Sequence, residues 1–193
     1  MSRTAWIILA VAAVLFLGAT GAIVIIAART KRGVFDQVKA AMLGELAALR
    51  PDLSDEQARE AAEIVAAQAV FETDGGATPA WIQGWNFGNV TTGGPAMWKG
   101  AIVVGPDTEY DSSGNVKNIS QQFRKYASLD DAVHDFLTVV LQWYRERQEG
   151  ALSKLLAGDA AGYSNALYRA GYYTLPAPEY LAGVRTYLDA YGA

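Results

Sequence analysis

The sequence predicts a mainly α-helical domain with one small β lobe, preceded by a membrane-spanning helix. Three observations support this fold class. Apolar residues recur at helical spacing over much of the chain from residue 34 onward. Residues 77–127 instead carry glycine, proline, asparagine and short apolar runs, which are typical of strands and turns. The first residues contain an uncharged apolar run that is long enough to cross a bilayer.

The apolar run extends from Ala5 to Ala28 and contains no charged side chain. At a rise of about 1.5 Å per residue, a helix of this length spans a hydrocarbon core of roughly 30 Å. The run exceeds the roughly 7–15 apolar residues of a signal peptide, although cleavage after a small residue such as Ala19 is the alternative. We therefore interpret residues 1–32 as a membrane anchor and residues 33–193 as the folded domain.

The domain after the anchor is acidic and contains no cysteine. All 20 acidic residues but only 12 of the 16 basic ones follow Arg32, so residues 33–193 have a net charge of −8. This balance disfavours binding to nucleic acid, which needs lysine and arginine to neutralise phosphates. Without cysteine, disulfides and thiolate metal sites are excluded, and the single histidine, His134, has no second histidine beside it. We expect no metal and no cofactor.

Two helices open the domain. The first is predicted over Val34–Leu49, where apolar residues share one face and Pro51 ends the pattern. The second begins at Ser54, because Gln57 stands three residues later in the capping-box arrangement.

The second helix leads to an isolated acidic residue. Its alanine-rich sequence continues to Glu72, and Gly75-Gly76 directly afterwards cannot sustain a helix, so the helix should end near Thr73. Glu72 is therefore placed at the end of a small-residue helix that can pack deep inside the domain.

A β hairpin is predicted between the second and third helices of the domain. Asp111–Asn115 is a strong turn signal, with Thr108–Tyr110 before it and Val116–Phe123 after it. Helical patterns then return, beginning at Ser128 with an apolar stripe that continues to Tyr144. Three further helices are expected over Ala151–Ala157, Ala160–Ala170 and Pro178–Tyr191.

Four segments, in order, resemble the family-73 glucosaminidases, which are peptidoglycan hydrolases of the autolysin and flagellar-rod type. The segments are Phe71–Gly76, Asn86–Asn89, the hairpin from Thr108–Tyr110 to Phe123–Ser128, and Ala166–Thr174 with Tyr180 beyond it. The resemblance extends from about Leu53 to Tyr191 and implies a lysozyme-like fold. Two departures are evident, since Asp74-Gly75 replaces Gly-Trp and Leu175 stands where the family usually has aspartate.

Glu72 is the candidate general acid. A carboxylic acid that is walled by aromatic side chains has its pKa raised by desolvation, and it can then donate a proton near neutral pH. The resemblance implies that Glu109 on the hairpin is the second carboxylate, with Asp107 and Asp111 as alternatives. It also implies that Tyr172 binds the substrate acetamido group or positions Glu72.

The candidate sugar-binding residues are an amide and nearby aromatic side chains. Asn86 suits hydroxyl or acetamido groups, and the faces of Trp81 and Trp85 suit the apolar side of a pyranose. We expect at least one tryptophan to be exposed in the groove. Tyr126 is added to this set, although the segment Phe123–Tyr126 that contains it is expected mainly to close the β lobe onto the next helix.

These inferences predict a membrane-anchored hydrolase that cuts β-1,4 bonds of the peptidoglycan glycan strand. A lytic transglycosylase using Glu72 alone is the nearest alternative, and a non-catalytic wall-binding module or a structural membrane protein are two others. Because peptidoglycan lies outside the cytoplasmic membrane, we expect the domain to be extracytoplasmic in a bacterial envelope or associated with a phage virion. Arg29, Lys31 and Arg32 favour the opposite orientation by the positive-inside rule.

Overall fold

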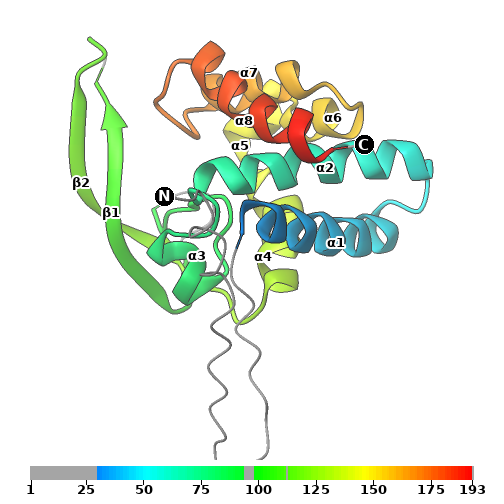
Figure 1. The fold of residues 1–193 in the computed structure, drawn as a ribbon, viewed down its shortest axis with the longest axis horizontal. Helices are drawn as coiled ribbons and strands as arrows, with labels where there is room; N and C mark the ends of the chain where they lie inside the picture. Colours follow the sequence, from blue (N-terminus) through cyan, green and yellow to red (C-terminus); the bar gives the residue numbers. More distant parts are fainter. Residues whose placement is uncertain (1–29, 94–97, 112, 193) are drawn as a thin grey trace, which may run out of the picture.

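The structure is a computed structural model that describes residues 30–93, 98–111 and 113–192. A body of helices lies beside a long two-stranded hairpin (Figure 1). In the described part of the chain, no helix combines the length and the apolar character needed to span a bilayer. The predicted span, Ala5–Ala28, lies outside the described residues, so the membrane anchor stays a prediction.

In the described part of the chain, helices pack around one central helix, and a two-stranded hairpin lies between α3 and α4 in the sequence. The elements in order are α1 (Lys31–Leu49), α2 (Asp55–Glu72), α3 (Pro79–Gly84), β1 (Ile102–Tyr110), β2 (Val116–Arg124), α4 (Leu129–Asp135), the π-helix η1 (Phe136–Val140), α5 (Tyr144–Glu149), α6 (Ala151–Leu156), α7 (Ala160–Ala170) and α8 (Ala177–Tyr191).

Helix α2 is the central element of the body. It begins with the predicted capping box, in which the Ser54 hydroxyl accepts from the Gln57 amide and the Gln57 side chain accepts from the Ser54 amide. Every residue from Ala61 to Val70 is buried, because α1 and α8 pack against this helix. Its C-terminal end points toward the hairpin (Figure 1). The small side chains of α2 thus allow close packing and bring Glu72 to the side of the body that faces the hairpin.

The predicted stop after α2 is confirmed. The Thr73 hydroxyl donates to the carbonyl of Ala69 over 2.6 Å and accepts from the amide of Gly76 over 2.9 Å. Gly76 has a positive φ of 90°, and a Cβ there would come within 2.8 Å of the Val34 side chain. Glycine is therefore required at this turn, for both its conformation and its small size.

The predicted hairpin is confirmed, with longer strands than expected. β1 and β2 are antiparallel, with Ile102 opposite Arg124 at one end and Tyr110 opposite Val116 at the other. Side chains alternate along β1, and the more buried face carries Val103, Gly105, Asp107, Glu109. This alternation directs two carboxylates to the same face of the strand.

The predicted continuous stripe to Tyr144 is wrong in its last part. Helix α4 continues into the π-helix η1, where the amide of Leu141 donates to the carbonyl of Phe136, five residues earlier. The wider π turn changes the angular positions of later side chains, and the chain then breaks before α5. Tyr144 consequently lies at the surface, 68% exposed, instead of in the core.

Helices α7 and α8 complete the body on the side of α2 opposite α1 (Figure 1). The predicted range of α7 is confirmed, and Gly171 ends it with a φ of 77°. The loop that follows, residues 171–176, returns the chain toward the hairpin. The amide of Tyr110 donates to the Thr174 hydroxyl over 3.0 Å, and this bond links β1 to the loop.

Candidate active site

Glu72 occupies the last position of α2, and two side chains hold its carboxylate. The Tyr180 hydroxyl donates to Oε1 over 2.5 Å, and the Asn89 amide donates to Oε2 over 3.2 Å. Asn89 also donates to the main-chain carbonyl of Glu72 over 2.7 Å. The carboxylate is therefore fixed by groups from α8 and from the loop after α3.

Burial raises the pKa of Glu72 to about 7. The hydrogen bonds from Tyr180 and Asn89 oppose this effect, since they stabilise the charged form, and the negative charge of Asp107 adds to it. A carboxyl group with a pKa near neutrality is protonated in a substantial fraction of molecules at physiological pH. Glu72 therefore has the property that a general acid needs.

Glu72 faces a pocket with a volume of about 360 Å³. The pocket lies between the body of helices and β1, and the loop after α7 forms its third side. Its lining consists of Phe71, Glu72, Gly88, Asn89, Thr91, Asp107, Thr108, Glu109, Tyr110, Gln121, Gly171, Tyr172, Tyr173, Thr174, Leu175 and Tyr180. Glu72, Glu109 and Tyr172, three of the residues singled out from the sequence, are thus brought to one pocket.

Two carboxylates of β1 line the wall opposite Glu72. Asp107 and Glu109 lie on the same face of the strand and both reach the pocket. Burial raises the pKa of Asp107, and the neighbouring charge of Glu109 adds to this shift. Asp111, the other alternative, lies outside this pocket, because its carboxylate accepts hydrogen bonds from Ser113 and Asn115 in the hairpin turn.

Tyr172 connects the two loops that flank Glu72. Its hydroxyl donates to the carbonyl of Gly88 over 2.6 Å. A Cβ at Gly88 would approach that hydroxyl to 2.5 Å, so the contact depends on glycine. The next residue, Asn89, adopts a positive φ of 49°, which asparagine tolerates better than most residues. The contact from Tyr172 therefore supports the turn that presents Asn89 to Glu72.

Aromatic rings form the wall around Tyr180. Its ring stacks on Tyr173 at a centroid distance of 3.6 Å, and Phe71 packs edge-on at 5.2 Å. The Tyr173 hydroxyl is held in turn by Ser164. This packing restricts the Tyr180 ring and keeps its hydroxyl directed at the Glu72 carboxylate.

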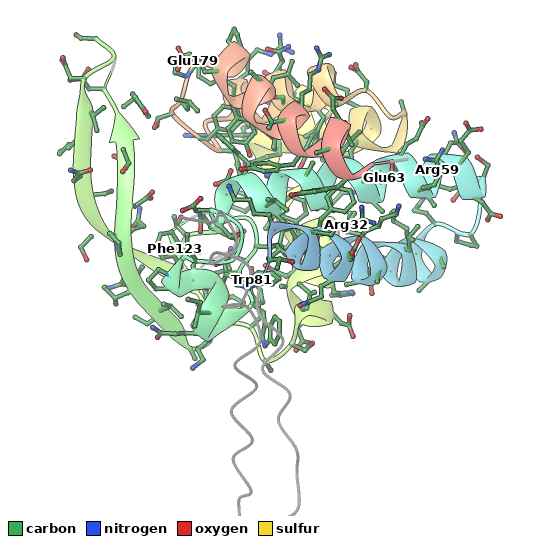
Figure 2. The ribbon with its side chains drawn as sticks, in the orientation of Figure 1. Arg32, Arg59, Glu63, Trp81, Phe123 and Glu179 are labelled. Atoms are coloured by element: carbon green, nitrogen blue, oxygen red, sulfur yellow. The ribbon has the colours of Figure 1, made fainter. Side chains whose placement is uncertain are left out.

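The four residues expected to bind sugar lie away from this pocket. Asn86 is only 1% exposed, and its side chain is fully engaged with the main chain of Val90 and Arg124. Trp81 is also 1% exposed and lies on α3 inside the body (Figure 2). Trp85 packs edge-on against Trp81 at 5.6 Å and is absent from the pocket lining.

Tyr126 is likewise part of the core. Its ring is buried, and its hydroxyl donates to Asp135 over 2.7 Å. Arg124 donates to the same carboxylate oxygen over 2.8 Å, so the end of β2 is joined to α4. The structure therefore supports the expected closing role of this segment and does not place Tyr126 beside the pocket.

Sequence reasoning missed Asn89, Tyr173 and Tyr180 as site residues. Asn89 follows Gly88, and a glycine next to an asparagine is a signal for a turn with a positive φ, which Asn89 adopts. Tyr180 was noted only as the end of a resembling segment. Their contribution depends on tertiary contacts across 17 and 108 positions of the sequence, which local patterns do not reveal.

Comparison with solved structures shows the same fold in three other proteins. The catalytic domain of the autolysin Auto from Listeria monocytogenes is 16% identical, with a TM-score of 0.56, over 83% of this chain and 84% of that chain. The glycoside hydrolase domain of FlgJ from Salmonella typhimurium is 23% identical, with a TM-score of 0.51, over 83% and 96%. A structure of N-acetylmuramoyl-L-alanine amidase from Staphylococcus aureus is 17% identical, with a TM-score of 0.59, over 90% of this chain but only 44% of that chain.

These likenesses confirm the lysozyme-like, mainly helical fold with its small hairpin. A search of curated proteins finds no match to the sequence. Residues 53–192 match the model of the Glucosaminidase family, described as mannosyl-glycoprotein endo-β-N-acetylglucosaminidase. Because the match covers most of the chain and agrees with the resemblance of the four sequence segments, the protein belongs to the glucosaminidase family and is a glycoside hydrolase.

Proposed function

We propose that this glycosidase cleaves β-1,4 bonds in the glycan strand of peptidoglycan, with Glu72 as the general acid. The observation that carries the proposal is the environment of Glu72. Its carboxyl group faces a pocket, has a pKa raised to about 7, and is oriented by Tyr180 and Asn89. The autolysin Auto and the glycoside hydrolase domain of FlgJ, which share this fold, support the choice of substrate class.

In the proposed reaction, protonated Glu72 donates its proton to the oxygen that leaves with the departing sugar. The bond between that oxygen and the anomeric carbon breaks, and positive charge develops on the sugar ring. The carboxylate that Glu72 becomes is stabilised by the two hydrogen bonds it already accepts. The site thus favours the acid before proton transfer through burial and stabilises its conjugate base afterwards.

Glu109 is our proposed second carboxylate, and Asp107 is its direct competitor. Both line the wall of β1 that faces Glu72, where a negative charge would stabilise the developing positive ring or activate water. Asp107 is the one whose charge raises the pKa of Glu72. Variants Glu109→Gln and Asp107→Asn separate the two assignments, because the essential residue is the one whose loss abolishes turnover.

Tyr172 is proposed as a positioning residue that also contacts substrate. Its hydroxyl hydrogen is used by Gly88, but the oxygen keeps acceptor capacity on the pocket side. An acetamido N–H of the sugar is a suitable donor to this oxygen. Tyr172→Phe should therefore weaken binding of N-acetylated sugar more than binding of the deacetylated analogue.

The nature of the cleaved ends distinguishes a hydrolase from a lytic transglycosylase. We would incubate the full-length protein with purified peptidoglycan and identify the released muropeptides by mass spectrometry. Reducing N-acetylglucosamine ends are expected for the proposed hydrolase. Anhydro ends, together with full activity of both Glu109→Gln and Asp107→Asn, would replace it with a transglycosylase that uses Glu72 alone.

We further propose that the domain acts outside the cytoplasmic membrane, held there by a helix over residues 5–28. The substrate is extracytoplasmic, and the apolar run has the length of a bilayer span. A spanning helix resists extraction by alkaline carbonate, whereas a peripheral contact does not. The full-length protein should remain in the membrane fraction after this treatment, and its complete release would contradict the anchor.

A further inference from the structure

A second pocket adjoins the candidate catalytic pocket on the other side of Tyr172. Its volume is about 470 Å³, and it lies between the loop after α3, the start of α5 and the end of α7. Residues common to the linings of both pockets are Asn89, Thr91, Gly171 and Tyr172. The two pockets therefore adjoin each other at these four residues.

Glu146 in this second pocket is a buried carboxylate whose bonding is incomplete. It is 4% exposed, and no hydrogen-bond donor in the described part of the chain reaches its Oε2 atom. A buried polar group without a partner is unfavourable, and more so when the group is charged. Burial raises the pKa of this carboxyl group, while a hydrogen bond from its own main-chain amide and the charge of Arg145 oppose the shift. Because the Glu146 side chain lines the pocket, a turn of its carboxylate would present this unpaired oxygen to a ligand as a hydrogen-bond acceptor.

Two exposed aromatic side chains precede Glu146. Trp143 is 40% exposed and Tyr144 is 68% exposed, and both line the second pocket. They stand at the surface because the π-helix and the break after it direct this segment away from the core. Aromatic faces at the rim with a polar acceptor inside are the combination that binds pyranose rings.

We propose that the second pocket is a saccharide subsite, in which Glu146 accepts a hydrogen bond from a sugar and Trp143 packs against the ring. The inference rests on the proposed function, since it concerns the part of the glycan strand next to the bond that is cut. Its consequence is that longer strands bind more tightly than short ones, and that this advantage depends on Glu146 and Trp143.

The test compares peptide-free N-acetylated glycans of increasing length as substrates of the full-length protein. Glu146→Ala should raise KM for long strands by roughly tenfold, about 1.4 kcal/mol, because the variant loses the hydrogen bond from the sugar. Trp143→Ala should raise this KM by a similar factor, because it removes the ring that packs against the pyranose. KM for the shortest cleaved strand should stay near the wild-type value. Glu149→Ala is the matched control, because this carboxylate on the same helix pairs with Arg169 and does not line the pocket.

The outcomes separate the subsite from the proposed function. Should the wild-type protein cleave glycans while both variants keep its length dependence, the subsite is overturned and the function stands. Should no glycan be cleaved, the subsite can still be tested by binding. Tryptophan fluorescence would measure the binding of the same glycans to the Glu72→Gln protein, with and without the additional change Trp143→Ala or Glu146→Ala. Equal binding by all three proteins would overturn the subsite. An effect confined to peptide-bearing strands would also overturn it, because the pocket would then bind the stem peptide. Because Trp143 is at the surface, its variant remains informative if Glu146→Ala does not fold.

Discussion

Glu72 is balanced between burial, which favours its protonated form, and two hydrogen bonds, which favour its charged form. The resulting pKa of about 7 keeps a substantial fraction of Glu72 protonated near neutral pH, as the proposed role requires. The bond from Tyr180 can be removed by Tyr180→Phe, because the ring contacts with Tyr173 and Phe71 do not involve the hydroxyl, whereas Asn89 also bonds to the main chain of Glu72. The pH dependence of activity therefore gives direct access to the contribution of Tyr180.

Tyr180→Phe should move the alkaline limb of the pH profile of kcat/KM to higher pH. The Tyr180 hydroxyl stabilises the charged carboxylate, so its removal raises the pKa of Glu72 and keeps the acid protonated at higher pH. Tyr173→Phe is the control, because that hydroxyl bonds to Ser164 and the ring stack is retained. A limb that shifts to lower pH in Tyr180→Phe would contradict this assignment.

At the scale of elements, local signals predicted the ends of helices well. The Ser54–Gln57 capping box, the stop at Gly75-Gly76 and the stop at Gly171 all occur as expected, because each depends on neighbouring residues alone. The pattern failed in the segment to Tyr144, where a π turn changes the helical period. A period of 3.6 residues assumes an unbroken α-helix, so the sequence could not show that this segment would expose its aromatic residues.

Asn86 joins structural elements, although the sequence suggested that it binds sugar. Its amide joins the loop after α3 to the end of β2 through bonds to Val90 and Arg124. Asn86→Ala would remove the acceptor of the Val90 amide and one donor to the Arg124 carbonyl, while the Val90 carbonyl keeps the bond from the Arg124 amide. A buried polar group left unpaired costs about 1–3 kcal/mol. We expect the free energy of unfolding to fall by about 1–3 kcal/mol in urea denaturation. Unchanged stability with weaker glycan binding would instead support the sugar-binding role.

At the scale of the whole molecule, the pocket is assembled from segments that are far apart in the sequence. The end of α2 supplies Glu72, β1 supplies Asp107 and Glu109, and the 171–175 loop and α8 supply the tyrosines. Glu72, Glu109 and Tyr172, the residues that the family resemblance singled out as catalytic, all line this pocket. Trp81 and Trp85 lie close to Glu72 in the sequence, but this nearness did not predict a place in the pocket. Apolar burial directs their rings into or against the core of the body instead.

The hairpin encloses this pocket because it is tied to the helical body at both ends. Arg124 at the end of β2 contacts Asp135 near its base, and Tyr110 at the end of β1 bonds to Thr174 near its tip. Figure 1 shows the hairpin standing beside the body along its full length. The wall that carries Asp107 and Glu109 is thus held opposite Glu72 by contacts at two separate places.

The central claim is that Glu72 donates the proton that breaks the glycosidic bond. The direct measurement is the turnover of purified peptidoglycan by the full-length protein and by Glu72→Gln, with thermal unfolding of both as the control for folding. The amide keeps the shape of the side chain but cannot donate as an acid, so turnover should fall by roughly 10²–10⁴-fold while folding is retained. A folded Glu72→Gln protein that keeps more than about a tenth of wild-type turnover would contradict the account, since general acid catalysis contributes far more than that.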